Sequence, residues 1–238
     1  MHTFKAYRDR LSLSQSQLKD LLNERLNRNY DRHTISRWEN RKQPIPAEVA
    51  AELELLVNRD PRETTVISFA NQKGGVGKTT SALNIAFALT RLNFRVLLID
   101  ADPQASATSA LVGSDIVSLY RNKKTLDAAL LKDEPITDII LPKDYELSDG
   151  RTLPFSLISS HIDLAEVDVR REPGTEGLLR EAIAKIKTDY DYIIIDSPPH
   201  LGFLTWMALT AAHLVYIPVR TEPYDVMGVN LILDTIAK

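Results

Sequence analysis

The residues best suited to chemistry stand in a glycine-rich segment, Lys73–Thr80, with the sequence KGGVGKTT. The apolar run Val66–Ala70 precedes it and a helical pattern follows, so we expect a strand that ends in a loop from which a helix begins. The N–H groups of such a loop, together with the positive end of the helix, can hold a polyphosphate. Lys78 would then pair with the β- and γ-phosphates, and the Thr79 hydroxyl would bind Mg²⁺.

The segment departs from the usual phosphate-loop pattern G-x-x-x-x-G-K-[ST] at one position, because Gln72 stands where the first glycine belongs. A second lysine, Lys73, begins the loop. The alternative interpretation, in which the glycines only form a tight turn, is disfavoured by the strand before and the helix after. The predicted nucleotide-binding residues are Gly74, Gly75, Val76, Gly77, Lys78, Thr79 and Thr80.

Three carboxylates follow two other apolar runs. Asp196 ends the run 192–195, and Asp100 and Asp102 follow the run 96–99. The carboxyl ends of parallel strands border the crevice in which α/β sheets bind ligands. Asp196 would hold the water shell of Mg²⁺, and one of the other two could orient an attacking water. Aspartates also cap turns, and Asp-Pro is a common turn, so the phosphate loop is what favours the site interpretation.

The elements that must position these residues alternate along the chain. Continuous apolar runs predict strands at 65–70, 94–99, 192–195 and 214–217. Helical patterns fall between and after them, at 78–91, 105–111, 175–187, 203–212 and 225–237. Strands buried on both faces and separated by helices predict a mostly parallel, twisted sheet with right-handed crossovers. Residues 113–154 are too irregular to assign.

The first sixty residues have a different pattern, with helices only. Ser14 is placed to cap a helix over 15–26, and Asp31 to cap a short helix that contains Ile35 and Trp38. A last helix is expected over 47–57. We therefore predict a small all-α domain at 1–60 and an α/β domain at 61–238, with Asn58–Pro61 as the linker. Because the chain ends inside a helical pattern, we also expect the second domain to be incomplete at its C-terminus.

Charge divides the chain in the same place. Residues 1–42 carry ten Lys and Arg against five Asp and Glu, whereas the whole chain of 238 residues has a net charge of −3. A basic head suggests a polyanionic partner, although a solvated helical surface would have the same composition. There is no cysteine, no signal peptide and no apolar run near the ~20 residues that a membrane span needs. These features predict a cytoplasmic protein without a membrane partner.

Three motifs together resemble one family. The loop KGGVGKTT, the segment Asp100–Gln104 and the segment Ile195–Pro199 occur in the order of the ParA/MinD family, the deviant Walker A ATPases that partition plasmids and chromosomes or position division machinery. Further similar stretches are Leu157–Ser160, Asp163–Ala165, Ile217–Val219 and Gly228. The resemblance covers about residues 64–238, and the Asp-Pro-Gln sequence is more like the partition branch.

The resemblance implies a three-layer P-loop fold and a dimer that holds two ATP molecules between its subunits. Lys73 would reach the partner's ATP, as an arginine finger does in other P-loop enzymes. Asp102 would position the water, Asp100 would support the Mg²⁺ region, and Pro218 to Pro223 would border the base. Hydrolysis of ATP would be slow until a ParB-like partner protein stimulates it.

The N-terminal domain resembles the helix-turn-helix of phage-repressor-like regulators, with residues 24–30 in place of the usual short turn. Trp38 is more readily explained by packing in the small core than by DNA binding, and a head used for protein contacts remains an alternative. Under the DNA-binding interpretation, the groove and phosphate contacts would come from Gln15, Arg32, Thr34, Ser36, Arg37 and Arg41.

The sequence thus predicts a nucleoid-associated partition ATPase that dimerises on ATP, binds DNA and requires Mg²⁺. One alternative is a transcriptional regulator in which ATP switches operator affinity. A second is a positioning ATPase for a cargo other than DNA. A third is a metabolic P-loop enzyme such as a carboxylate-activating synthetase, which is disfavoured because the sequence contains no recognisable substrate pocket.

Overall fold

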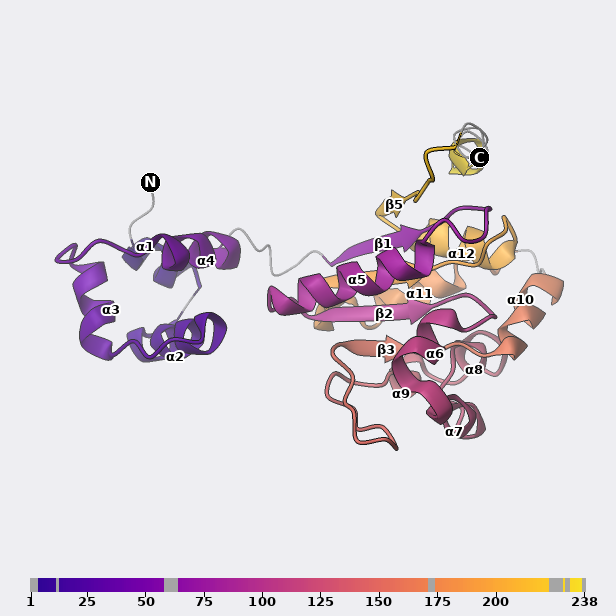
Figure 1. Ribbon diagram of the computed structural model, residues 1–238, viewed down its shortest axis with the longest axis horizontal. Coiled ribbons are helices and arrows are strands. Elements are labelled where there is room, and N and C mark those ends of the chain that lie inside the picture. The colour runs from indigo at the N-terminus through magenta and orange to yellow at the C-terminus, as the bar shows by residue number, and fades with distance from the viewer. Residues whose placement is uncertain are drawn as a thin grey trace. The chain divides into compact units, whose positions relative to one another are not determined.

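The computed structural model describes residues 4–11, 13–57, 64–170, 174–222, 229 and 232–236 (Figure 1). The chain divides into two compact units, Met1–Arg62 and Glu63–Lys238. The predicted linker Asn58–Pro61, together with Pro223, Gly228 and most of the helix expected at 225–237, lies outside the described residues.

The first unit is helical throughout its described part, and two of its helices begin where the sequence predicts. Ser14 caps α2, since its side chain accepts from the N–H of Gln17 while the Gln17 side chain accepts from the N–H of Ser14. Asp31 caps α3 through the N–H of Thr34. The helices are α1 (Phe4–Arg10), α2 (Gln15–Leu26), α3 (Arg32–Glu39) and α4 (Ala47–Val57).

These four helices enclose one small core. Its buried members come from every helix, and Trp38, only 2 % exposed, lies at its centre. The Trp38 ring contacts Phe4 and Tyr30, with ring centroids 5.4 Å and 5.0 Å away. Burial of this large aromatic side chain supplies much of the apolar contact of such a small unit, which agrees with the packing interpretation of Trp38.

The turn between α2 and α3 is shorter than predicted. Helix α2 continues to Leu26, so residues 24–26 are helical and the connection is residues 27–31. Asn27 ends the helix in the left-handed conformation, with φ 49°. The Asn23 side chain then bonds to both the N–H and the C=O of Tyr30, and this pairing closes the turn. The sequence interpretation missed it because Asn23 and Tyr30 are seven residues apart.

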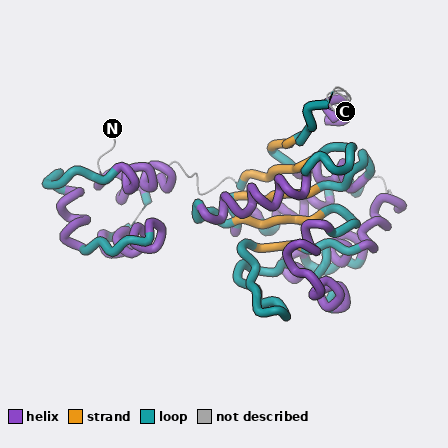
Figure 2. Tube along the Cα trace, in the orientation of Figure 1, coloured by secondary structure: helices purple, strands orange, loops and turns teal. Residues whose placement is uncertain are grey.

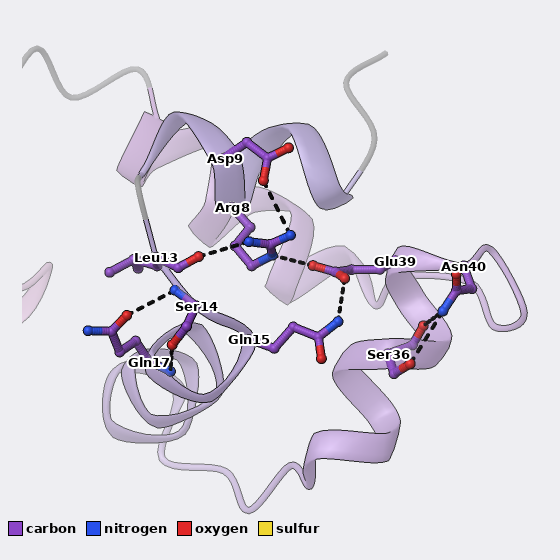
Figure 3. A network of polar contacts seen from close by, with 9 residues as sticks. All are labelled: Arg8, Asp9, Leu13, Ser14, Gln15, Gln17, Ser36, Glu39 and Asn40. Atoms are coloured by element: carbon purple, nitrogen blue, oxygen red, sulfur yellow. Dashed lines mark hydrogen bonds and ion pairs between the residues drawn. The ribbon is translucent and has the colours of Figure 1, made fainter.

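A charged network joins three parts of the first unit (Figure 3). The Glu39 carboxylate, 8 % exposed, accepts from Arg8 Nε of α1 and from Gln15 Nε2 of α2, each at 2.5 Å. Arg8 also donates to the Leu13 carbonyl at 3.0 Å. A nearly buried carboxylate with two donors from other helices fixes how α1, α2 and α3 pack together.

The second unit is built on a five-stranded sheet in which every strand pairing is parallel. The strand order is β3-β2-β4-β1-β5. Its strands are β1 (Thr65–Phe69), β2 (Val96–Asp100), β3 (Ser156–Ile158), β4 (Tyr192–Asp196) and β5 (Leu214–Tyr216). Four of them were predicted, and β3 was not. Pro154 and Ser156 interrupt the apolar residues of this segment, so no continuous apolar run marks the strand.

Helices cover both faces of this sheet, as Figures 1 and 2 show. Because side chains alternate along a strand, each central strand contributes to two cores. Leu97 and Ile99 pack with α8, α9, α10, α11 and α12, whereas Val96 and Leu98 pack with α5, α6 and α7. The helices are α5 (Lys78–Arg91), α6 (Ser106–Val112), α7 (Ile116–Arg121), α8 (Leu126–Leu131), α9 (Ile136–Ile139), α10 (Ala165–Arg170), α11 (Leu178–Ala184) and α12 (Phe203–Ala211), with 3₁₀ turns at Gly113–Asp115, Ile162–Leu164 and Lys187–Asp189. The unit therefore has the predicted three-layer α/β fold.

The region that the sequence left unassigned is ordered around the sheet. Within residues 113–154, three short helices, α7 to α9, supply buried side chains to the two cores. Leu141 then bridges to Leu157 of β3 in the antiparallel sense. Helices of four to six residues are below the length at which a periodic pattern can be recognised. Within the described part of the chain, no helix is both long and apolar enough to cross a bilayer.

Replacement of the central carboxylate should destabilise the first unit. In Glu39→Ala, Arg8 and Gln15 lose their acceptor, and we expect the free energy of unfolding to fall by about 2 kcal/mol. Trp38 fluorescence in a Trp206→Phe background reports this unit during urea denaturation.

The matched control is Asp9→Ala, because Asp9, 56 % exposed, also pairs with Arg8 but stands in solvent. Its loss should cost less than about 0.5 kcal/mol. Equal effects of the two substitutions would contradict the structural role of Glu39.

Candidate functional site

The glycine-rich loop connects β1 to α5, as the sequence predicts. Gly75 and Gly77 have φ of 69° and 92°, a conformation that other residues rarely adopt. Gly77 is the N-cap of α5 and has no side chain to occupy the helix N-terminus. The first N–H groups of a 14-residue helix therefore remain for an anion, and the helix dipole favours a negative charge there.

Lys78 lies at the beginning of α5 with only 7 % of its surface exposed. Its Nζ donates to the carbonyl of Lys73 at 3.1 Å, so the side chain folds back over the loop. Burial lowers the pKa of Lys78, and the charges of Asp196 and Asp102 oppose this effect. The structure thus brings together the predicted phosphate-binding lysine and two of the predicted carboxylates.

The segment after β5 lies against the same loop. Asn71, 3 % exposed, donates from Nδ2 to the Pro218 carbonyl at 2.7 Å and accepts from the Lys73 N–H at 3.0 Å. Arg220 donates to the Gly75 carbonyl. Pro218 therefore lies beside the loop through its main chain. No contact of the described residues tests its predicted role at the base.

Lys73 pairs with this segment too. Its Nζ lies 3.1 Å from Glu222 Oε2, and the two side chains are 40 % and 56 % exposed. An ion pair this exposed is worth at most about 1 kcal/mol. Breaking this ion pair therefore costs little when another anion approaches Lys73.

Asp100 and Asp196 end neighbouring strands at the same height. They are direct partners in the β2–β4 register, and Phe69, the last residue of β1, pairs with Asp196 on the other side. Both carboxylates are fully buried. Burial raises the pKa of Asp100 to about 6, against the hydrogen bonds that it accepts from Thr108 and Asp102.

Asp196 is also buried, but it accepts fewer hydrogen bonds than Asp100 to stabilise its charged form. Burial and the neighbouring Asp100 raise its pKa to about 7, while the Thr79 hydroxyl and Lys78 act in the opposite direction. Within the described part of the chain, neither of its side-chain oxygens has a hydrogen-bond partner of normal geometry. A buried carboxylate with unsatisfied oxygens fits a site for Mg²⁺ and its water shell, with Thr79 beside it.

Protein side chains alone do not form a complete cation site here. No cluster of three or more His, Cys, Asp or Glu that could hold a metal is present among the described residues. The oxygens of Asp196 and Thr79 are of the type that Mg²⁺ prefers, since this ion keeps several waters and is held by one or two protein oxygens together with substrate phosphates. The predicted roles of Thr79, Asp100 and Asp196 at the metal remain predictions.

Asp102 lies two residues beyond the end of β2 and is 7 % exposed. Its Oδ1 accepts from the N–H of Gln104 at 2.9 Å, and its own N–H donates to Asp100 Oδ1 at 3.2 Å. The Asp-Pro-Gln segment is thus a turn, as expected of Asp-Pro, and the turn itself orients the Asp102 carboxylate.

Sequence reasoning assigned no role to Asn71 and Thr108, which help to hold the site together. It included Ser160, Arg220 and Glu222 only within the stretches Leu157–Ser160 and Pro218–Pro223, without their contacts. Asn71 lies two residues before the loop, so its position could have been noticed. Thr108 bonds to the Asp100 carboxylate across eight residues, whereas Ser160, Arg220 and Glu222 reach Asp102 or the loop across 58 to 149 residues of sequence. No local pattern could have indicated these contacts.

The predicted DNA-binding residues lie on the first unit. Arg32, Arg37 and Arg41 are exposed. Thr34 and Ser36 are half-buried, and the Asn40 side chain donates to the Ser36 carbonyl and hydroxyl. Gln15 donates its amide to Glu39, so part of its side chain is already engaged in holding the unit together (Figure 3).

Comparison with known proteins identifies relatives for the second unit. Residues 64–238 match a family model described as an AAA domain. The chain is 40 % identical over 172 residues to the chromosome partitioning protein ParA of Myxococcus xanthus. It is 39 % identical over 171 residues to the sporulation initiation inhibitor protein Soj of Bacillus subtilis. Each alignment covers 72 % of this chain, but it spans only 57 % of the former relative and 64 % of the latter.

Two solved structures are also similar to this chain. A plasmid partition protein from Borrelia burgdorferi is similar with a TM-score of 0.64 and 30 % identity, covering 74 % of each chain. A cobyrinic acid a,c-diamide synthase from Mycobacterium smegmatis, solved with ADP and magnesium, is similar with a TM-score of 0.63 and 38 % identity. That match covers 74 % of this chain and 67 % of the synthase.

The raised pKa of Asp196 predicts a stability that depends on pH. Its folded-state value of about 7 lies above the ordinary 3.8, so between these values the unfolded chain ionises first and the nucleotide-free fold loses stability as pH rises. Asp196→Asn removes this loss. The difference in unfolding free energy between Asp196→Asn and the parent should therefore shift in favour of the variant by about 1–3 kcal/mol between pH 5 and pH 8.

Urea denaturation followed by circular dichroism measures this difference. Asp115→Asn is the control, since Asp115 lies away from the site and accepts a hydrogen bond from the N–H of Ser148. A gain for Asp196→Asn that is the same at every pH would show that Asp196 ionises normally.

Proposed function

Because this chain belongs to the ParA/MinD family of P-loop ATPases, we propose that its second unit binds and hydrolyses ATP with Mg²⁺ and that the protein acts in DNA partition. The observation that carries the proposal is the buried Asp196 carboxylate, with both oxygens unsatisfied, beside Lys78 and Thr79 at the end of the sheet. The partition names of the Myxococcus xanthus and Borrelia burgdorferi relatives support the biological part.

The loop would bind the phosphates by its main chain. Gly74 to Gly77 would present N–H groups, and Lys78 would add a positive charge whose attraction to phosphate is stronger in this mostly buried position. The Thr79 hydroxyl and Asp196 would hold Mg²⁺, which supplies positive charge to the phosphate oxygens. Because burial favours the protonated form of Asp196, a cation beside it would let this carboxyl release its proton.

Asp102 is suited to orient the attacking water. Its carboxylate is fixed by the turn that contains Gln104 and lies near enough to Lys78 to influence the charge of that lysine. A carboxylate held in this way can align a water and accept its proton as the oxygen attacks phosphorus.

Lys73 would act on the ATP of a second subunit. It stands at the start of the loop, 40 % exposed, and its ion pair with Glu222 is weak. A cation placed on the charge that develops at the γ-phosphate stabilises the transition state, which is the role of an arginine finger. ATP would then join two copies of the chain, and a ParB-like partner protein would control the rate of hydrolysis.

The first unit would bind DNA through α3. The exposed Arg32 and Arg37 lie on this helix, and its buried residues Ile35 and Trp38 point into the core. An exposed basic face on a helix that is anchored by its other face can lie against a phosphate backbone.

A second candidate function is an ATP-dependent synthetase, favoured by the similarity to the Mycobacterium smegmatis synthase. The two candidates differ in whether DNA participates. Hydrolysis of ATP that double-stranded DNA stimulates supports partition. Hydrolysis that DNA leaves unchanged and a carboxylic acid with an amide donor stimulates supports the synthetase.

The two lysines of the loop should have separable effects. Lys78→Ala removes the charge on the β- and γ-phosphates and should weaken binding of a fluorescent ATP analogue at least tenfold, or about 1.4 kcal/mol. Lys73→Ala should bind the analogue within about threefold of the parent but lose both the dimer and hydrolysis. Analytical ultracentrifugation with a slowly hydrolysed analogue measures the dimer.

The control for these variants is Lys185→Ala, an exposed lysine at the end of α11. It should change neither binding nor dimerisation. If Lys73→Ala dimerised and hydrolysed ATP like the parent, the proposed role of Lys73 across the interface would be wrong.

DNA binding by the first unit can be tested by salt dependence. Arg32→Ala removes one proposed phosphate contact and should lower the slope of log K against log salt by about 1. Fluorescence anisotropy on a random duplex and on DNA upstream of the chain's own gene, with ADP and with ATP, separates nonspecific binding from recognition of one site.

The matched control is Arg28→Ala, because the Arg28 guanidinium is already paired with Glu48 at 2.9 Å. Salt slopes that stay unchanged in Arg32→Ala, Arg37→Ala and Arg41→Ala alike would assign the first unit to protein contacts instead of DNA.

A further inference from the structure

The turn that carries Asp102 is held by hydroxyl groups from two other elements. Thr108 of α6 donates to Asp100 Oδ2 twice, from its N–H at 2.8 Å and from its hydroxyl at 2.7 Å. Ser160, which follows β3, donates its hydroxyl to the Asp102 carbonyl at 2.7 Å. Thr108, Ser160 and Asp100 are all completely buried. Water therefore cannot replace these bonds when one of them is lost.

The direction of the bonds in this network is fixed. The N–H of Ser160 donates to the Thr108 hydroxyl at 2.8 Å. A hydroxyl has a single proton, and at Thr108 that proton goes to Asp100. The bonds therefore run in one direction, from Ser160 through Thr108 to the Asp100 carboxylate. Bonds that follow one another in this way polarise and strengthen each other in a buried site.

Asp102 is consequently held on both sides of its backbone. Its N–H donates to Asp100 Oδ1, and its C=O accepts from Ser160. Its side chain is then oriented by the N–H of Gln104. Neither Thr108 nor Ser160 bonds to the Asp102 carboxylate itself, so their effect on it is transmitted by the main chain.

We propose that Thr108 and Ser160 are positioning residues for ATP hydrolysis, which set the direction of the Asp102 carboxylate by fixing the main chain on both sides of it. This inference rests on the proposed ATPase function. The network joins β2, α6 and the end of β3, so it connects the attacking-water side of the site to a strand that β2 and β4 separate from β1 and the phosphate loop.

Loss of a positioning residue leaves ATP binding intact, whereas loss of a purely structural residue does not. The phosphates would be held by the loop and by Lys78, neither of which bonds to Thr108 or Ser160 in the described residues. Loss of the hydroxyl should thus slow the chemical step while binding of ATP remains. A general loosening of the fold would instead weaken binding and hydrolysis together.

The test is single-turnover hydrolysis of ATP by the full chain, with binding of a fluorescent ATP analogue measured in parallel. Thr108→Val keeps the shape of the side chain but removes its hydroxyl, and it should lower the rate about 10-fold to 100-fold with the dissociation constant within about threefold. Thr108→Ser restores the hydroxyl and should return the rate to within about threefold of the parent.

Ser160→Ala removes the hydroxyl bond to the Asp102 carbonyl while it keeps the N–H that donates to Thr108, and it keeps the proposal testable if Thr108→Val does not fold. It should also slow hydrolysis more than it weakens binding. The matched control is Thr64→Val, because Thr64 is a buried threonine that donates its hydroxyl to the Tyr190 carbonyl at the opposite end of β1. It should keep the parent rate.

The outcomes separate the two proposals. A parent chain that neither binds nor hydrolyses ATP overturns the proposed function and this inference with it. A parent that hydrolyses ATP while folded Thr108→Val and Ser160→Ala keep its rate overturns the positioning role alone. Parallel losses of rate and affinity, or a Thr108→Ser variant as slow as Thr108→Val, also overturn it.

Discussion

The parallel pairing of β1, β2 and β4 is the constraint on which the rest of the second unit depends. It aligns the ends of the three strands, so that Asp100 and Asp196 become direct neighbours and the glycine-rich loop begins beside them. Two buried carboxylates next to each other repel one another and lose their hydration. The fold therefore has to supply donors, a lysine or a cation at this edge of the sheet.

The two carboxylates meet this requirement differently. Asp100 receives three hydrogen bonds from Thr108 and Asp102, which makes it part of the framework. Asp196 receives none of normal geometry from the described residues and has the more strongly raised pKa. A protein that leaves one buried carboxylate unsatisfied beside a phosphate loop gives up stability at a place where a ligand can recover it.

The segment after β5 adds a second constraint on the loop. Its contacts with Asn71, Gly75 and Lys73 hold the loop and the residues just before it. The bond between Asn71 and Pro218 is partly buried, whereas the ion pair of Lys73 is exposed. The base of the loop is therefore firmly placed, while Lys73 at its start can change partners with little loss of stability.

Local chemistry allowed the sequence alone to predict the phosphate loop, four of the five strands, the caps Ser14 and Asp31 and the three site carboxylates. Strand and helix periodicity, glycine conformation and capping act over a few residues, so the sequence records them directly. The short β3, the helices of residues 113–154, the start of the α2–α3 turn and the hydroxyl network of Thr108 and Ser160 were decided by tertiary structure. These features depend on side-chain partners that a local pattern does not reveal, at separations from seven residues for Asn23 and Tyr30 to 52 residues for Thr108 and Ser160. A buried polar group takes whichever partner the fold brings within reach.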